Sequence, residues 1–318
     1  MELKSIKTVG VLGLGTMGHG IAQNFAMAGF DVRCYDQDAG TRDEVLDRIR
    51  GNLLQLETAG VIRNDVIDET LGRLEVFESE SLAVEGVEFV TEAIAEQLEV
   101  KQALFARLES LVSPDTLLAS NSSSFTITQS ATQMTCPERA VVTHWFNPPH
   151  IIPVVEVVPG AKTSAATTNT TIQLLKQIGK KPVRINKEIP GFLVNRVQMA
   201  MYREIWDLLD QGVASAEEID EAISGSMGMR LAAVGPLQIN DFAGIDISVL
   251  TYRNLVPNMR GDHQVPAKLE RLDAEGHHGA KTGSGIFQYT DESLRQAYEK
   301  RDQRYLALIK LLRGDADE

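Results

Sequence analysis

Short apolar runs alternate with longer amphipathic segments through the first part of the chain. The apolar runs contain β-branched residues, which is typical of buried strands, and they occupy residues 8–12, 31–36, 87–92, 116–119, 140–144, 154–158 and 182–185. Helical periodicity fills several of the gaps, at residues 16–29, 40–71, 97–112 and 166–178. Strands that alternate with helices predict an α/β fold, with a mostly parallel, doubly wound sheet and helices on both of its faces.

The pattern changes near residue 188. After the segment KEIPGF, which begins at Lys187, β-rich runs disappear and the periodicity is helical. We therefore expect an N-terminal Rossmann-type domain over residues 1–188 and an all-α C-terminal domain over residues 189–318. Residues 314–318 read GDADE, and we expect them to form a solvated tail.

Composition and charge narrow the possible partners. The chain has 318 residues, enough for two domains, and a formal net charge of −13, which argues against a nucleic-acid partner. The N-terminus lacks the pattern of a secretory signal, and no apolar run approaches the ~18 residues needed to cross a membrane. Cys34 and Cys136 form no CxxC pair, so we interpret both as reduced structural thiols and expect no metal site. These features favour a cytoplasmic protein with a small-molecule partner.

A glycine-rich segment follows the first predicted strand and begins the first predicted helix. It reads GLGTMG, with Gly13, Gly15 and Gly18 in the GxGxxG spacing. The first glycine permits a tight turn, the second lets a pyrophosphate approach the backbone, and the third lets helix and strand pack closely. Thr16 and Met17 begin the helix, whose free N–H groups favour phosphate binding. A plain glycine-rich turn is the alternative, but the position between strand and helix predicts a dinucleotide site.

Asp36 ends the second predicted strand and indicates which dinucleotide binds. A carboxylate there accepts hydrogen bonds from the adenosine ribose and repels a 2′-phosphate. The nearest basic residue, Arg33, lies inside the strand rather than just after Asp36. The sequence therefore predicts NAD rather than NADP.

His144 and Glu156 are the candidates for proton transfer. His144 ends an apolar strand at the carboxyl edge of the sheet, where such folds bind ligands, although a histidine there can also be structural. Glu156 interrupts the apolar run VVEVV, and a buried carboxylate is costly unless it is paired. The intervening FNPP sequence would turn the chain so that Glu156 approaches the imidazole, fixing its tautomer and raising its basicity. A Glu156 paired with an unrelated Arg or Lys remains the alternative.

Ser123 belongs to a polar segment, ASNSSS, that follows another predicted strand and reaches the same edge of the sheet. A serine there can cap a helix, or it can hydrogen-bond the oxygen of a reacting hydroxyl group. Both roles stay open at this point.

Together these motifs resemble the L-3-hydroxyacyl-CoA dehydrogenase family. The matching segments span nearly the whole chain and read GLGTMGHGIA, TEAIAEQLEVK, ASNSSS, HWFNPPHIIPVVEVV, PGFLVNR and KTGSGIF. The spaced His and Glu together with PGFLVNR are the specific part, since the glycine loop is widely shared. The resemblance implies NAD as cofactor, a Rossmann domain, and a helical domain that helps to bind substrate and through which such proteins usually form homodimers.

The resemblance also implies roles for individual residues. His144 would be the base and Glu156 its orienting carboxylate, while Ser123 and Asn195 would contact the substrate oxygen. The adenosine half of NAD would be held by Gly13, Gly15, Gly18 and Asp36. The nicotinamide half would be lined by Glu96, Lys101 and Asn121, with Asn147 shaping the site.

Two departures leave the substrate open. Acyl-CoA members typically carry a basic helical hairpin after the second strand, whereas residues 41–70 here contain four Arg, no Lys and seven acidic residues. Pro153 and the segment GMRLA resemble instead the branch of L-gulonate 3-dehydrogenase, lambda-crystallin and L-carnitine dehydrogenase, in which Arg230 would hold a substrate carboxylate. Arg230 in a surface salt bridge is the alternative. The substrate is therefore an L-3-hydroxyacyl-CoA, as family abundance suggests, or a free 3-hydroxy acid.

Two further classes fit less well. Dehydrogenases of the 3-hydroxyisobutyrate and 6-phosphogluconate type also begin with GLGxMG, but they use a catalytic lysine where this chain reads PGFLVNRVQMAM. A cofactor-binding structural or sensor protein would not need His144, Glu156, Ser123 and Asn195 together.

Overall fold

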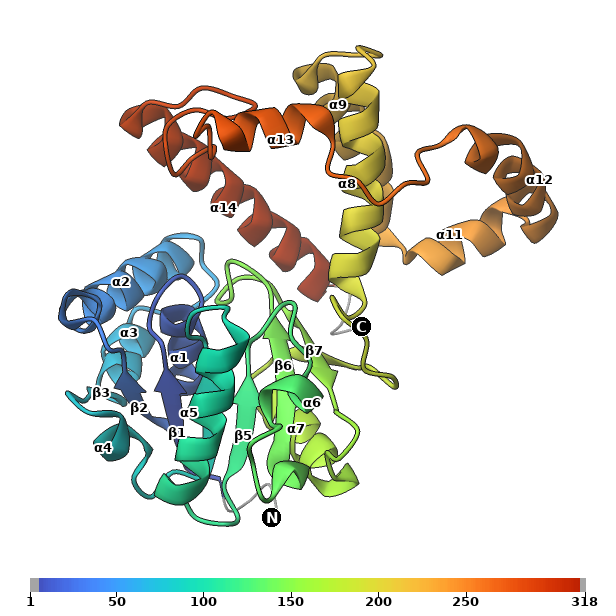
Figure 1. Cartoon of the computed structure of the whole chain (residues 1–318). Helices are drawn as coiled ribbons and strands as arrows, with labels where there is room; N and C mark the ends of the chain where they lie inside the picture. The colour runs from blue at the N-terminus through green and yellow to red at the C-terminus, as the bar shows by residue number, and fades with distance from the viewer. Residues whose placement is uncertain (1–5, 315–318) are drawn as a thin grey trace. The chain divides into compact units, whose positions relative to one another are not determined.

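The computed structural model of the chain describes residues 6–314, so most of the expected solvated tail lies outside the described residues. The chain forms two compact units, Met1–Asn195 and Arg196–Glu318 (Figure 1). The division falls a few residues after position 188, where the sequence pattern changes. The segment between belongs to the first unit because Phe192 is completely buried there and the N–H groups of Leu193 and Val194 bind Glu156.

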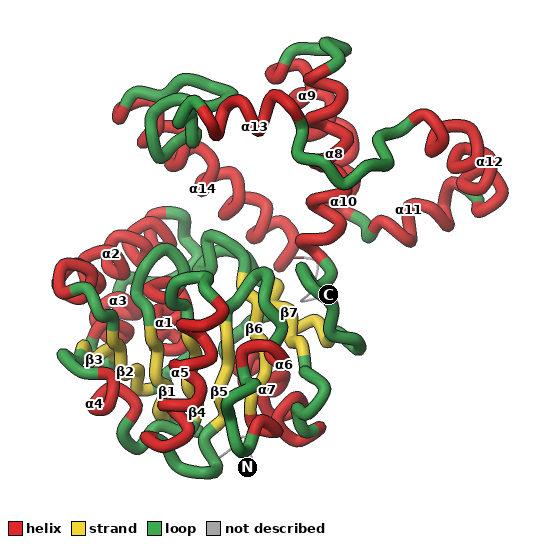
Figure 2. The backbone as a smooth tube through the Cα atoms, in the orientation of Figure 1, coloured by secondary structure: helices red, strands yellow, loops and turns green. Residues whose placement is uncertain are grey.

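An eight-stranded sheet forms the centre of the first unit, in the order β3-β2-β1-β4-β5-β6-β7-β8 (Figure 2). Every neighbouring pair is parallel except β6 and β7. The strand order reverses beside β1, and in doubly wound sheets ligands bind at that point, outside the carboxyl ends of the strands. The strands are β1 (Thr8–Leu12), β2 (Asp31–Tyr35), β3 (Leu74–Val76), β4 (Phe89–Glu92), β5 (Leu117–Ser120), β6 (Ala140–Trp145), β7 (Val154–Val158) and β8 (Lys181–Arg184).

Helices cover both faces of this sheet, each over its own apolar core. Successive residues of β1 point to opposite faces, so Val11 joins one core and Leu12 the other. One face is covered by α1 (Gly18–Met27), α2 (Ala39–Thr58), α3 (Asp65–Leu71) and α7 (Ala165–Gln177). The other face is covered by α4 (Glu80–Val84), α5 (Leu98–Leu111) and α6 (Ile127–Ser130), and a short 3-10 helix, η2 (Pro137–Arg139), precedes β6.

The second unit is helical. Its buried apolar side chains, among residues 196–312, are Ile219 and Leu306, while Leu237, Phe242 and Tyr252 are 81 %, 73 % and 68 % exposed. The helices are α8 (Val194–Asp210), α9 (Ala216–Ile223), the π-helical turn η3 (Ser224–Gly228), α10 (Met229–Ala233), α11 (Pro236–Ala243), α12 (Ile245–Leu255), η4 (Val256–Asn258), α13 (Ala267–Ala274) and α14 (Asp291–Gly314).

The predicted fold class, a Rossmann-type sheet followed by a helical domain, is confirmed. The helical pattern over residues 40–71 is two helices rather than one, α2 and α3, because the chain turns at Gly60, which has a φ of 68°. Strand β3 was not predicted, since three residues are too few to show a period. No helix within residues 6–314 has both the length and the apolar character needed to cross a bilayer, and the same residues contain no cluster of potential metal ligands.

Candidate active site

His144 and Glu156 face each other across the antiparallel pair of strands β6 and β7. They are direct register partners, and Nδ1 of His144 lies 2.7 Å from Oε2 of Glu156. Both side chains are buried, with 5 % and 1 % exposure. A carboxylate oxygen can only accept a hydrogen bond, so the proton of the neutral imidazole is on Nδ1. Nε2 therefore keeps the lone pair that a general base needs.

The second oxygen of Glu156 anchors the start of helix α8. Oε1 accepts hydrogen bonds from the backbone N–H groups of Leu193, at 3.1 Å, and Val194, at 2.9 Å. The first N–H groups of a helix have no partner within the helix, and a negative charge is stabilised beside them. The carboxylate is thus held on both oxygens, which explains how it can lie inside an apolar strand.

Two aromatic rings fix the plane of the imidazole. The ring centroid of His144 lies 4.6 Å from that of Phe146 and 5.5 Å from that of Phe192. Phe192 follows Gly191, and both have positive φ, 50° and 75° respectively. A left-handed conformation is unfavourable for a bulky residue, so the burial of its ring must hold Phe192 there. The segment PGF thereby carries the chain past the imidazole into α8.

Glu96 organises the serine loop after β5. Its Oε1 accepts hydrogen bonds from Oγ of Ser122 at 2.6 Å, N of Ser123 at 3.0 Å, and N and Oγ of Ser124 at 3.0 and 2.8 Å. Burial by itself would raise the pKa of Glu96. The hydrogen bonds from Ser122 and Ser124 and the charge of Lys101 outweigh burial and lower the pKa to about 2. Glu96 is therefore charged at neutral pH and holds the loop that contains Ser123.

Lys101 is enclosed between two carboxylates. It is 1 % exposed, and its Nζ lies 2.8 and 2.9 Å from the two oxygens of Glu92 and 3.2 Å from Oε2 of Glu96. The hydroxyl of Ser120 also donates to Glu92. Sequence reasoning missed Glu92, although it ends an apolar strand in the same way as Glu156 interrupts one. Glu96 binds both the ammonium of Lys101 and the serine loop, and so it links the two.

The other predicted residues of this edge lie on neighbouring loops and at the start of α8. Nδ2 of Asn195 donates to the carbonyl of Ser123 at 3.1 Å, and the Ser123 side chain is exposed. Oδ1 of Asn121 accepts from N of Trp145 at 3.0 Å, which joins the ends of β5 and β6. Asn147 is exposed and precedes a cis peptide bond. The groups that sequence reasoning assigned to the reaction thus come from β6, β7, the loop after β5 and the start of α8.

The glycine-rich turn has the shape that a dinucleotide requires. Gly13 has a φ of 85°, and a Cβ added to it would lie 2.6 Å from the carbonyl oxygen of Ala93. A Cβ on Gly18 would lie 1.7 Å from the carbonyl oxygen of Gly13. A Cβ on Gly15 would meet no atom within 4 Å, so it would project into open space beside the turn. The outer glycines therefore permit close packing, and the middle one leaves room for a pyrophosphate.

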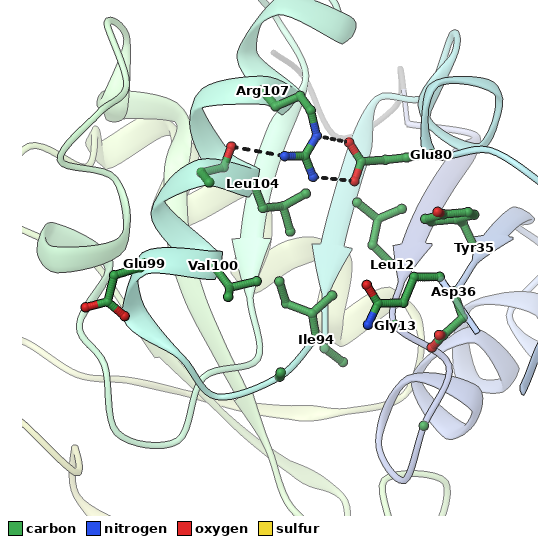
Figure 3. A pocket seen from close by; sticks show the side chains of 15 residues that line it. Leu12, Gly13, Tyr35, Asp36, Glu80, Ile94, Glu99, Val100, Leu104 and Arg107 are labelled. Atoms are coloured by element: carbon green, nitrogen blue, oxygen red, sulfur yellow. Dashed lines mark hydrogen bonds and ion pairs between the residues drawn. The ribbon is translucent and has the colours of Figure 1, made fainter.

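A pocket of about 650 Å³ extends from this turn along the ends of β1, β2 and β4 (Figure 3). Asp36 lines it, and its carboxylate accepts from N of Leu14 at 2.7 Å and from N of Asp38 at 2.9 Å. Arg107 and Glu80 form a bidentate ion pair at 2.6 and 2.7 Å on the wall of the pocket. Apolar side chains line the rest, among them Leu12, Ile94, Val100 and Leu104. The residues present fit the adenosine half of NAD.

Arg230 belongs to the second unit and lies on α10. Its side chain is exposed, and its Nε donates to the carbonyl of Ser226 at 3.3 Å. It is therefore accessible to a ligand.

Comparison with protein families agrees with this geometry. The model described as "3-hydroxyacyl-CoA dehydrogenase, NAD binding domain" matches residues 8–189, and "3-hydroxyacyl-CoA dehydrogenase, C-terminal domain" matches residues 191–289. The chain belongs to the 3-hydroxyacyl-CoA dehydrogenase family. It is an NAD-dependent dehydrogenase, like its relatives, and the predicted family and cofactor are confirmed.

Relatives within the 3-hydroxyacyl-CoA dehydrogenase family differ in what they act on. A 5-formyl-3-hydroxy-2-methylpyridine 4-carboxylate 5-dehydrogenase of Mesorhizobium japonicum is 34 % identical over 97 % of this chain and 99 % of its own length. A solved structure of an enzyme with that activity covers 97 % of this chain and 99 % of its own chain, with 31 % identity and a TM-score of 0.91. A 3-hydroxybutyryl-CoA dehydrogenase of Clostridioides difficile is 36 % identical over 88 % of this chain and 98 % of its own length. Rabbit (Oryctolagus cuniculus) lambda-crystallin is 36 % identical, with 72 % of each chain covered.

Proposed function

We propose that this dehydrogenase oxidises the hydroxyl group of a small free 3-hydroxy acid, with His144 as the proton acceptor. The observation that carries the reaction is the buried pair of His144 and Glu156, in which Nδ1 of the imidazole contacts the carboxylate and Nε2 is the nitrogen left for the substrate. The observation that favours a free acid over a coenzyme A thioester is the charge of the α2–α3 hairpin.

The chemistry follows from the positions of these side chains. The substrate hydroxyl gives its proton to Nε2 of His144, and Glu156 stabilises the imidazolium that forms. Bound NAD would supply the hydride acceptor, its nicotinamide ring, for the hydride that leaves the carbon bearing the hydroxyl group. Ser123 and the amide of Asn195 hydrogen-bond the reacting oxygen as it becomes a carbonyl oxygen. The Glu92–Lys101–Glu96 cluster keeps the serine loop in place during the reaction.

The α2–α3 hairpin is a poor surface for the phosphates of coenzyme A. Six of its acidic side chains are exposed: Asp43, Glu44, Asp47, Asp65, Asp68 and Glu69. Each of its four arginines is bound within the same unit: Arg42 to the carbonyl of Asp36, Arg48 to those of Leu14 and Gly15, Arg50 to Asp68, and Arg63 to Asp65. Few cationic groups are left to attract a polyanion.

A coenzyme A thioester is the second candidate. The matching family models and the Clostridioides difficile relative are named for coenzyme A substrates, and both candidates use the same proton acceptor. The Mesorhizobium relative, by contrast, is named for a substrate that is a free pyridine carboxylate. That relative and the hairpin charge support the free acid.

Measuring NAD reduction with several substrates distinguishes the two candidates. We expect turnover of at least one free acid among 3-hydroxybutyrate, carnitine and gulonate, and little turnover of 3-hydroxybutyryl-CoA. The variant His144→Ala is the negative control, because activity that it lacks can be assigned to this site. Turnover of the thioester with none of the free acids would overturn the proposed substrate while leaving the proposed base intact.

We propose further that the chain forms a homodimer through its helical unit. The support is the large apolar surface of α11 and α12, which a monomer would expose to water. In this arrangement the second copy covers side chains that include Leu237 and Phe242.

A further inference from the structure

Arg48 reaches from helix α2 to the far side of the glycine-rich turn. Its two terminal nitrogens lie 3.1 Å from the carbonyl oxygen of Leu14 and 3.3 Å from that of Gly15. Helix α2 is fixed in this position because its inner face buries Ile49 and Leu53 in the core. The side chain of Arg48 is therefore directed at the turn by the packing of the helix.

These two carbonyls belong to the peptide units that carry the N–H groups of Gly15 and Thr16. In a trans peptide the C=O and N–H bonds are coplanar and point in opposite directions. Holding the carbonyls of Leu14 and Gly15 on the Arg48 side therefore directs the two N–H groups to the opposite side. Within residues 6–314, neither N–H donates a hydrogen bond to the protein, so both are free to bind a ligand.

We infer that Arg48 is a positioning residue for the cofactor pyrophosphate. It binds the turn from behind, and it holds the N–H groups of Gly15 and Thr16 toward the phosphate oxygens. The guanidinium charge also polarises the two peptide units and makes their N–H groups stronger donors. The GxGxxG spacing does not require this contact, which depends on the residue that α2 places behind the turn.

His19 holds the same turn by a second contact. Its Nδ1 lies 2.7 Å from the carbonyl oxygen of Gly15 and 3.1 Å from a terminal nitrogen of Arg48, and a hydrogen bond in the shorter of these two contacts places the ring proton on Nδ1. Burial lowers the pKa of His19; the hydrogen bond to Gly15 opposes this, and the charge of Arg48 adds to it. A neutral ring can stay close to the guanidinium without repulsion. Gly15 is thus held by two side chains, from α1 and α2.

Calorimetric titration of ADP-ribose and NAD tests the role of Arg48 without relying on turnover. We expect Arg48→Gln to weaken binding of both ligands about tenfold, as for the loss of a charge-assisted pair of hydrogen bonds. Arg50→Gln is the matched control, because it removes the same charge from the same helix and its partner is Asp68. Equal affinities of wild-type protein and Arg48→Gln, or equal losses in the two variants, would overturn the inference.

Two further measurements separate positioning from charge alone. Arg48→Lys keeps the charge but cannot bind two carbonyls in a planar, bidentate manner, so we expect it to recover only part of the affinity. Hydrogen exchange of the peptide that covers the glycine turn should be faster in ligand-free Arg48→Gln than in wild-type protein, with the core strands unchanged. Full recovery by lysine, or unchanged exchange at the turn, would count against positioning. Both measurements concern the cofactor turn, so their results do not depend on which substrate the enzyme oxidises.

Discussion

At the scale of single residues, carboxylates with several partners organise this edge of the sheet. Glu156 has hydrogen-bond partners on both oxygens, one of which is the imidazole and the other the start of α8. Glu92 and Glu96 share the ammonium of Lys101 in a similar way. Glu156 and Glu92 would be costly to bury alone, and they are stable because their partners come from other elements, whereas the side chain of Glu96 is 35 % exposed.

Replacing Glu156 with Gln tests the tautomer argument. The amide nitrogen would donate to Nδ1 of His144 and move the ring proton to Nε2, the atom proposed to accept the substrate proton. We expect kcat to fall by about 10²–10⁴, the range for a lost general base, with the Kd for NAD unchanged. His144→Ala should show a similar loss, and the double variant little more, because the two residues act as one unit. A Glu156→Gln enzyme with wild-type kcat would contradict this account.

The lowered pKa of Glu96 predicts a dependence of stability on pH. The pKa is about 2 in the folded chain against an ordinary 4.5, so its contribution is complete above about pH 4.5 and is lost as the pH falls toward 2. We therefore expect Glu96→Gln to lower Tm clearly at about pH 7 and much less at about pH 3. The exposed residue Glu85 provides a control variant, Glu85→Gln. A Tm difference that stays constant over this range would exclude the proposed linkage.

At the scale of elements, the contact between β1, the glycine turn and α1 decides how closely the cofactor can approach. The three glycines have different surroundings: Gly13 and Gly18 lie against backbone atoms, whereas Gly15 faces open space. These surroundings agree with the separate roles expected from the sequence, which are close packing at Gly13 and Gly18 and room for a pyrophosphate at Gly15.

Two alanine variants should separate these roles. Gly18→Ala places a Cβ 1.7 Å from a backbone oxygen, so we expect it to cost about 3 kcal/mol of unfolding free energy through overpacking. Gly15→Ala should leave Tm unchanged but weaken NAD binding about tenfold or more, because the methyl group would occupy the approach of the pyrophosphate. Denaturant unfolding and NAD titration of both variants check this. A lower stability of Gly15→Ala together with weaker NAD binding only in Gly18→Ala would contradict these roles.

The elements also show where sequence reasoning stops. Strands β1 and β7 were predicted with their observed bounds, since alternating or continuous apolar runs of five residues are a strong local signal. The short elements β3, α4 and α6 were not predicted, because three to five residues carry too little pattern. In the sequence Arg48 is one of four arginines within residues 41–70, and only the packing of α2 brings it to the turn.

At the scale of the whole molecule, the exposed apolar surface of the helical unit supports the proposed homodimer. We expect the purified protein to have twice the mass of one chain in light scattering after gel filtration. The double variant Leu237→Asp/Phe242→Asp should be monomeric, because a buried unpaired charge opposes association. Leu54→Asp, on an exposed position of α2, is the control and should remain a dimer. Unchanged mass in the double variant would place the interface elsewhere.

The sequence by itself determined the fold class, the family and NAD as the cofactor, since these depend on local periodicity and on motifs whose residues are close together in the chain. It also pointed to His144 and Glu156, because a polar residue in an apolar strand stands out from its neighbours. Only the tertiary structure decided which groups hold these residues. The partners of Lys101, Glu96 and Arg48 come from other strands, loops and helices, and such contacts depend on how elements pack rather than on any pattern along the chain.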